Sequence, residues 1–337
     1  MIKTKNIPRI ALKVLKVRLG KRIPLKVTQY ITYRCNYKCA FCGRILNKAE
    51  ELTTDQIKRC MKEFKKLGTE FWGFNGGEPL LRKDIGELVD YAKRLGLKRS
   101  ISTNGFFIPN KINQIKNIDL ILVSLDGPKE VHDKIRGTGA YKKVIEALKI
   151  LNKNKVRTLI MTVISKENLD HMEHLLSIVK EYECDWELQP ITIHKADIEK
   201  KAEEFFPDHK RFLETVDWLI KQKNKGNPIT NSVGYLEQMK LPLNSNKIPD
   251  CWAGRLVCVM SPDGYVLPCA EMLELSKNYK SLLDVGVKEA FNSLPDMSKC
   301  RMCKFSCYME YNVALGSLFK TGFKSINNIF KGKQFWQ

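Results

Sequence analysis

The sequence predicts an α/β protein with a parallel sheet, followed by a smaller cysteine-rich unit. Short β-branched or apolar runs alternate with longer segments of helical period from Lys26 to about Pro190, which is typical of repeated βα units. Six of the eleven cysteines fall between Cys251 and Cys307, in a turn-rich stretch too short to build a large core. With 337 residues, 43% of them hydrophobic, the chain has room for one large catalytic domain and a smaller annex.

Six runs are predicted as strands of this sheet. They are Lys26–Thr32, Glu70–Asn75, Lys98–Thr103, Leu120–Leu125, Arg157–Val163 and Trp186–Gln189. Helices are predicted between the strands, among them Thr53–Leu67 and Asp84–Leu95. In the first of these helices, Thr53 and Gln56 fit a capping box. Gly68 and Gly96 stand where the two helices should end.

The formal net charge of +21 comes mainly from the two ends of the chain. Residues 1–49 hold 13 Lys or Arg and no acid, and residues 311–337 hold four Lys and no acid. The middle of the chain is nearly balanced, so nucleic acid is not an expected partner. No apolar run approaches the length of a spanning helix and no signal peptide opens the chain, so we expect a cytoplasmic protein with reduced thiols.

Three cysteines lie together just after the first predicted strand. Cys35, Cys39 and Cys42 have the spacing Cys-x3-Cys-x2-Cys. Three thiolates on one loop can face a single centre, and they leave one iron of a [4Fe-4S] cluster without a protein ligand. Such an open position is what chemistry at the metal requires. The alternative is a structural zinc site, which needs a fourth ligand that the neighbouring sequence does not supply.

This spacing resembles the signature of the radical S-adenosylmethionine (radical SAM) superfamily, over about residues 26–190. The resemblance implies a partial (β/α)6 barrel of the TIM type. It also implies that Cys35, Cys39 and Cys42 hold the catalytic [4Fe-4S] cluster, which binds S-adenosylmethionine (SAM) at the open iron. Reductive cleavage of SAM would then give a 5′-deoxyadenosyl radical that abstracts hydrogen from a substrate.

Further motifs match family positions that contact SAM at the carboxyl ends of the strands. Gly76 and Gly77 let the backbone come close to the methionine moiety, and Glu78 offers an anionic acceptor to its ammonium. By the same resemblance, the other expected SAM-binding residues are Pro79, Ser102, Asn104, Ser124, Asp126, Arg136 and Leu188, with Leu188 and Gln189 beside the adenine. Asn-Gly and Asp-Gly are also ordinary turn dipeptides, and the alternative for Arg136 is a solvated surface charge.

The later cysteines resemble the SPASM or twitch extension that carries auxiliary iron–sulfur clusters in this superfamily. They are Cys251, Cys258, Cys269, Cys300, Cys303 and Cys307, with a hairpin turn at Pro262-Asp263-Gly264. The resemblance implies at least one auxiliary cluster, a [4Fe-4S] centre held by Cys251, Cys269, Cys300 and Cys303. Cys258 and Cys307 would then join a second, incompletely ligated cluster. A zinc ribbon is the alternative. Cys60 and Cys184 fit small buried apolar residues.

The predicted organisation has five parts. A basic amphipathic segment (1–25) precedes the barrel (26–225), a linker (226–250), the auxiliary cluster domain (251–311) and a basic amphipathic helix (312–337). The two terminal segments fit either packing against the barrel or anchoring on an anionic membrane surface.

Taken together, these features predict a radical SAM enzyme acting on an unidentified substrate, which the basic amphipathic ends suggest is hydrophobic or membrane-associated. The main alternative is a peptide- or protein-modifying SPASM maturase. Lesser alternatives are an RNA-modifying enzyme and a non-enzymatic iron–sulfur or zinc scaffold. The resemblance also implies an electron donor such as a flavodoxin or ferredoxin, and the basic ends suggest peripheral association with the inner face of the membrane.

Overall fold

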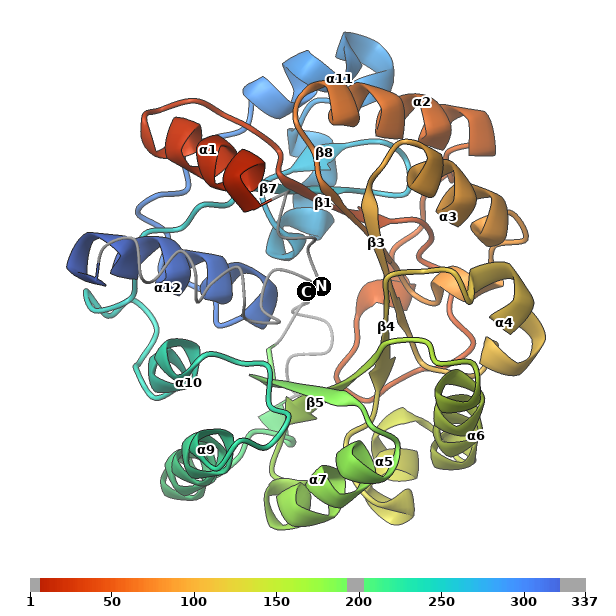
Figure 1. The fold of residues 1–337 in the computed structure, drawn as a ribbon, viewed down its shortest axis with the longest axis vertical. Coiled ribbons are helices and arrows are strands. Elements are labelled where there is room, and N and C mark those ends of the chain that lie inside the picture. Colours follow the sequence, from red (N-terminus) through yellow and green to blue (C-terminus); the bar gives the residue numbers. More distant parts are fainter. Residues whose placement is uncertain (1–6, 193–202, 322–337) are drawn as a thin grey trace.

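The computed structural model describes residues 7–192 and 203–321, and in these ranges the chain forms a curved sheet surrounded by helices (Figure 1). The strands follow one another around the sheet in the order β6-β5-β4-β3-β2-β1-β7-β8. They are β1 Lys26–Tyr30, β2 Phe71–Asn75, β3 Lys98–Thr103, β4 Leu120–Ser124, β5 Thr158–Ile164, β6 Asp185–Pro190, β7 Val257–Met260 and β8 Val266–Leu267. Neighbouring strands are parallel except for the β7–β8 hairpin. The predicted fold class, a barrel-like α/β protein followed by a cysteine-rich segment, is confirmed.

The helices cover the outside of the sheet. The first half of the chain contributes α1 Ile7–Arg18, α2 Thr54–Lys66, α3 Ile85–Arg94, α4 Ile108–Ile115, α5 Lys129–Arg136 and α6 Ala140–Lys153. The second half contributes α7 Met172–Glu181, α9 His209–Asn224, α10 Val233–Met239, α11 Leu282–Asn292 and α12 Ser306–Thr321. The capping box at Thr53 and Gln56 is present, and Gly68 and Gly96 both have positive φ just after their helices.

Residues alternate along each strand between two surroundings, as the pleat requires. One set is apolar and packs against the helices, for example Val27, Trp72 and Trp186, all fully buried. The other set faces the inside of the barrel and includes Thr28 and Gly73. The outer set supplies the hydrophobic core, which leaves the inner set free to line a cavity.

The sheet does not close on itself within the described residues, because β6 and β8 are its two edges. Helix α12 lies on that side, between α1 and α10 in Figure 1, and it contacts β6. Its first turn carries Ser306, Cys307 and Tyr308, which face the interior. The open side of the barrel is therefore covered by residues from the end of the chain.

Helix α1 is held on the barrel by a buried carboxylate at the start of β2. Glu70 accepts hydrogen bonds from Arg9 (2.7 Å) and Lys13, and Ile10 and Val14 are buried beneath the helix. The part of the N-terminal segment that is described thus packs against the barrel. The C-terminal segment predicted over 312–337 lies outside the described residues from 322 onward.

Replacing Glu70 by glutamine should lower the free energy of unfolding by about 1–3 kcal/mol, because three cations, Arg9, Lys13 and Lys65, lose their buried partner. The exposed Lys58–Glu87 pair provides a matched control. Glu87→Gln should cost less than about 0.5 kcal/mol, since surface pairs are screened. Urea titrations followed by circular dichroism give both values, and equal shifts would show that Glu70 does not anchor α1.

Candidate active site

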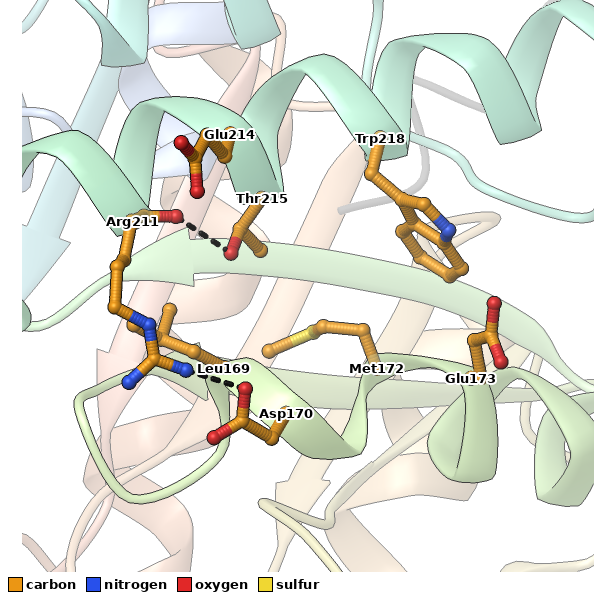
Figure 2. Close-up of a pocket in the computed structure, with 8 residues that line it drawn as sticks. All are labelled: Leu169, Asp170, Met172, Glu173, Arg211, Glu214, Thr215 and Trp218. Carbon is orange, nitrogen blue, oxygen red and sulfur yellow. Dashed lines mark hydrogen bonds and ion pairs between the residues drawn. The ribbon is translucent and has the colours of Figure 1, made fainter.

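Two cavities of similar size and a smaller one of about 200 Å³ lie in the described part of the chain, and among these three only one contains the predicted residues. The first, of about 270 Å³, lies on the surface between α7 and α9 (Figure 2). Arg211 pairs with Asp170 across it, and none of the predicted site residues lines it. The second, of about 280 Å³, occupies the inside of the barrel and its mouth at the carboxyl ends of the strands. Ligands of barrel enzymes bind at this end, so the second cavity is the candidate active site.

The loop after β1 brings Cys35, Cys39 and Cys42 to the mouth of this cavity, and all three line it. Each thiol lies within electrostatic range of the other two. Burial raises the pKa of Cys39 to about 11, although the guanidinium of Arg136 lowers it. Burial also raises the pKa of Cys35. A buried thiolate needs positive charge beside it, and the irons of a cluster would supply that charge.

The sulfur of Cys35 accepts a hydrogen bond from the backbone N–H of Tyr37, two residues later (N···S 3.5 Å). Hydrogen bonds to sulfur stabilise cluster thiolates and tune their potential. The amide nitrogen of Asn104 lies 3.9 Å from the same sulfur. The residues present therefore fit an iron–sulfur cluster at the predicted position.

Gly76 and Gly77 allow a close backbone contact, as predicted, but the contacting backbone is that of the segment after β1. A Cβ on Gly76 would lie 2.4 Å from the carbonyl oxygen of Thr32, and one on Gly77 would lie 2.3 Å from that of Arg34. Gly77 N–H donates to the Thr32 carbonyl (2.8 Å). The two glycines thus let the end of β2 pack directly on the segment that leads into Cys35. Both also line the cavity.

Glu78 is fully buried and does not line the cavity. Its carboxylate accepts hydrogen bonds from Thr103 Oγ1 (2.8 Å), Asn104 N (2.8 Å) and Leu80 N (3.0 Å). Burial raises its pKa to about 7, while these three bonds lower it. Glu78 therefore ties the end of β2 to the end of β3. Pro79, which starts a short 3-10 turn, is buried and does not line the cavity either.

The predicted polar residues of β3 and β4 do reach the cavity. Ser102, Asn104 and Ser124 line it. The amide of Asn104 is oriented by two contacts, because its Nδ2 donates to Asn36 (2.8 Å) and its Oδ1 accepts from Phe106 N (3.0 Å). These short side chains leave room for a ligand at the mouth.

Arg136 lines the cavity and is held in place by Asp126. Its Nε donates to Asp126 Oδ2 (2.6 Å), and its Nη1 lies 4.0 Å from the sulfur of Cys39. Only 11% of the Arg136 side chain is exposed, so it is not a solvated surface charge. Asp126 is fully buried and does not line the cavity; its other oxygen accepts from Val163 N (2.9 Å). Asp126 is thus placed to orient Arg136.

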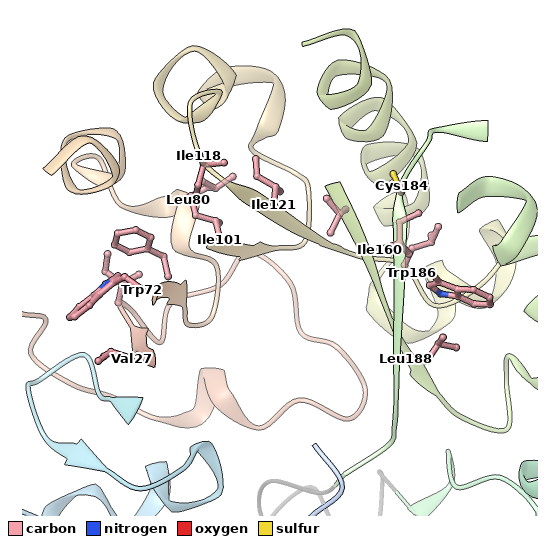
Figure 3. Packing of buried hydrophobic residues seen from close by; sticks show 14 of the residues in the cluster. Val27, Trp72, Leu80, Ile101, Ile118, Ile121, Ile160, Cys184, Trp186 and Leu188 are labelled. Atoms are coloured by element: carbon pink, nitrogen blue, oxygen red, sulfur yellow. The ribbon is translucent and has the colours of Figure 1, made fainter. Parts of the chain in front are cut away.

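Leu188 points out of the barrel. Figure 3 shows it among the side chains of the packed cluster, below Trp186. Its neighbours Glu187 and Gln189 line the cavity instead. The alternation Trp186-Glu187-Leu188-Gln189 carried this information, because a period of two places the polar pair on one face. Glu187 was missed by the sequence analysis, as was Lys26, which also lines the cavity.

Four of the six later cysteines are linked through electrostatic contacts. The sulfurs of Cys251, Cys269 and Cys303 lie within electrostatic range of one another, and Cys300 lies within range of Cys251. Burial raises the pKa of Cys269 to about 12, while the N–H of Glu271 lowers it. The sulfurs of Cys251 and Cys303 likewise accept a hydrogen bond from the N–H two residues later, as Cys35 does. This repeated arrangement fits an auxiliary cluster.

Of the other two cysteines, Cys258 lies apart from this group, whereas Cys307 lies within electrostatic range of Cys303. Cys258 on β7 is buried in the helix-facing core. Burial raises the pKa of its thiol, and no neighbouring charge contributes to this shift. Cys307 lines the cavity, where burial raises its pKa to about 12 and Lys26 lowers it. The eleven cysteines all lie in the described ranges and all are free.

Neither a single-ion metal site nor a membrane span is found in the described ranges. Over residues 7–192 and 203–321, no three His, Cys, Asp or Glu side chains converge as the ligands of one metal ion would. A [4Fe-4S] cluster spaces its thiolates more widely, because each binds a different iron. No helix in the same ranges is long and apolar enough to cross a membrane.

Comparison with known proteins agrees with this geometry. Residues 30–179 match the family model of the radical SAM superfamily. The mycofactocin maturase MftC of Mycolicibacterium smegmatis is 28% identical over 280 residues, which are 80% of this chain and 69% of that protein. The Fe-coproporphyrin III synthase of Methanosarcina barkeri is 32% identical over 182 residues, which are 49% of this chain and 46% of that protein.

The fold is similar to that of Streptococcus suis SuiB, solved bound to the precursor peptide SuiA. The two chains superpose with a TM-score of 0.66 over 90% of this chain and 77% of that chain, at 16% identity. A barrel with three thiols at its mouth and further cysteines beside it defines an iron–sulfur enzyme of the α/β class. Residues 30–179 carry a radical SAM domain, and the relatives together with the cysteine-rich segment after the barrel support an enzyme that uses a [4Fe-4S] cluster and SAM.

Proposed function

We propose that this enzyme modifies a peptide, the alternative that the sequence analysis placed second. The cavity carries the argument. A hydrocarbon substrate needs an apolar interior, whereas Lys26 and Glu187 face the inside of this barrel. The relative named as a maturase and the neighbour solved with a precursor peptide support the same substrate class.

In this proposal Cys35, Cys39 and Cys42 hold the cluster, which when bound supplies the electron that cleaves SAM to a 5′-deoxyadenosyl radical. Arg136, oriented by Asp126, binds the carboxylate of SAM. Asn104, Ser102 and Ser124 offer hydrogen bonds to its polar groups. We assign the contact with the adenine to Gln189 and not to Leu188, since only Gln189 lines the cavity. Glu78 shapes the mouth of the cavity indirectly, because its hydrogen bonds hold the ends of β2 and β3 together. Pro79 starts the turn that follows.

We assign the auxiliary cluster to Cys251, Cys269, Cys300 and Cys303, within the unit predicted over 251–311. Cys251→Ala should then lower the iron content of the reconstituted protein by about four atoms per chain. Cys258→Ala, a matched buried thiol in the core, should leave the iron content unchanged. Iron and sulfide assays after anaerobic reconstitution test this, and equal iron loss in the two variants would contradict the assignment.

The peptide hypothesis is tested by anaerobic reconstitution with SAM and a reductant. The probes are synthetic peptides encoded by short reading frames beside the gene, with Fe-coproporphyrin III as a competing probe. A peptide substrate should increase the rate of 5′-deoxyadenosine formation and change mass, as followed by liquid chromatography and mass spectrometry. Stimulation by the porphyrin and by none of the peptides would overturn the proposal.

Two partner proposals accompany this function. A flavodoxin or ferredoxin supplies the electron, which is tested by replacing the chemical reductant with reduced flavodoxin.

Helix α1 also leaves Leu12 and Leu15 52% exposed, on the side away from the barrel, and Leu19 just beyond it 76% exposed. This apolar edge favours peripheral contact with a membrane surface. In liposome flotation, less protein should be recovered with the vesicles when Leu12 and Leu15 are changed to serine. Equal recovery of the wild type and this variant would count against membrane contact through α1.

A further inference from the structure

The inside of the barrel carries two charged side chains that the binding of SAM does not use. Lys26 begins β1 and Glu187 lies in β6, and both line the cavity with Thr28, Ser100 and Met161. At about 3.3 Å per residue, Lys26 lies roughly 13 Å along β1 from the strand end that leads to the cysteines. Lys26 thus occupies the deeper part of the cavity, whereas Glu187 lies opposite Met161, which pairs with Ser124 at the end of β4.

No ion pair and no hydrogen bond of ordinary length joins Lys26 or Glu187 to the described residues, although the two side chains lie within electrostatic range of each other. Glu187 is fully buried, and both of its carboxylate oxygens lack a partner. The Ser306 hydroxyl donates a long hydrogen bond to Gln189 Oε1 (3.4 Å), and it lies close enough to Glu187 to favour its ionised form. Lys26 is 6% exposed, and its ammonium lies 5.8 Å from the ring centre of Tyr311, without an ion pair to a described carboxylate.

Two buried side chains of this kind lower the stability of the protein when the cavity is empty. Burying a carboxylate or an ammonium without a hydrogen bond costs free energy, and apolar side chains of the same size would avoid that cost. Such costs are found where a ligand completes the hydrogen bonds. The missing group must offer a donor to Glu187 and an acceptor to Lys26. An amide carries both, one N–H and one C=O.

We propose that Lys26 and Glu187 form a substrate-recognition pair, in which an amide group of the peptide donates to Glu187 and accepts from Lys26. This inference rests on the proposed function, because it names the part of the peptide that enters the barrel. It makes the pair a determinant of substrate position, since the bound amide fixes which hydrogen lies below the mouth.

The first test measures thermal stability of the reconstituted enzyme without peptide. The double variant Lys26→Met/Glu187→Leu should melt about 3 °C or more above the wild type, because two unsatisfied buried charges are removed. Glu70→Leu is the matched control. Glu70 is a buried carboxylate outside the cavity that accepts hydrogen bonds from Arg9 (2.7 Å) and Lys13, so this variant should melt below the wild type.

The second test uses the peptide that stimulates the wild type. Glu187→Gln should raise the KM for this peptide at least about 10-fold, with a smaller change in kcat, because a charged acceptor is lost. Glu70→Gln should change it less than about 2-fold, as expected of a residue outside the cavity.

The outcomes separate this inference from the proposed function. If no peptide stimulates the wild type, the proposed function fails and the inference fails with it. If a peptide stimulates the wild type and Glu187→Gln leaves its KM unchanged, only the inference fails. A lower melting temperature of the double variant would also overturn it, because the pair would then be a structural element of the barrel.

Discussion

Cys39→Ser should reduce the formation of 5′-deoxyadenosine roughly 10³-fold or more, because the three thiolates act as one unit. Cys39 lies between Cys35 and Cys42 in the loop after β1, and its sulfur lies 4.0 Å from Arg136. Its loss removes one iron ligand and the sulfur closest to the guanidinium that we assign to SAM. The variant should also contain about four fewer iron atoms per chain.

Cys184→Ala serves as the control for this substitution. Cys184 is a buried thiol next to β6, and burial raises its pKa to about 12. It lines neither cavity and lies near no other cysteine, so iron content and turnover should be retained. Full turnover by Cys39→Ser would contradict the assignment of the catalytic cluster.

Gly77→Ala should lower the free energy of unfolding by about 3 kcal/mol or more, because the contact involves backbone on both sides. The new Cβ would lie 2.3 Å from the Arg34 carbonyl oxygen and 2.6 Å from that of Tyr33. The segment just before Cys35 would have to move, so the first cluster should assemble poorly as well. Thermal unfolding and iron content measure the two effects.

A glycine that lacks this contact provides the comparison. Gly96 has φ +68° after α3, and no atom lies within 4 Å of its Cβ position. Gly96→Ala should cost about 1 kcal/mol, which is the penalty of the left-handed backbone alone. Similar losses in the two alanine variants would show that the β2 end does not pack tightly on the cysteine loop.

The sequence predicted all six barrel strands, because each is a compact apolar or β-branched run between turns. It also predicted which short polar residues reach the mouth on β3 and β4, since a strand end is marked by its turn. It could not predict the direction of Glu78, whose partners Thr103 and Asn104 come from another strand. Pairing between distant segments decides such contacts, and periodicity contains no information on it.

The same limit explains the later cysteines. Spacing groups Cys258 with its neighbours along the chain, whereas the sheet turns its side chain into the helix-facing core. The hairpin at Gly264 was predicted from its turn residues and is present. The parallel pairing of β7 with β1 was not predicted, because a four-residue apolar run has several candidate neighbours.

Because β7 pairs with β1, part of the auxiliary segment belongs to the barrel sheet and cannot be removed without exposing β1. The strand that leads into the catalytic loop has β2 on one side and β7 on the other. A chain cut after residue 250 would leave one whole side of β1 bare, ready to join a second molecule edge to edge. Grafting this barrel onto another cysteine-rich module would succeed only if the donor brought a strand in the same register.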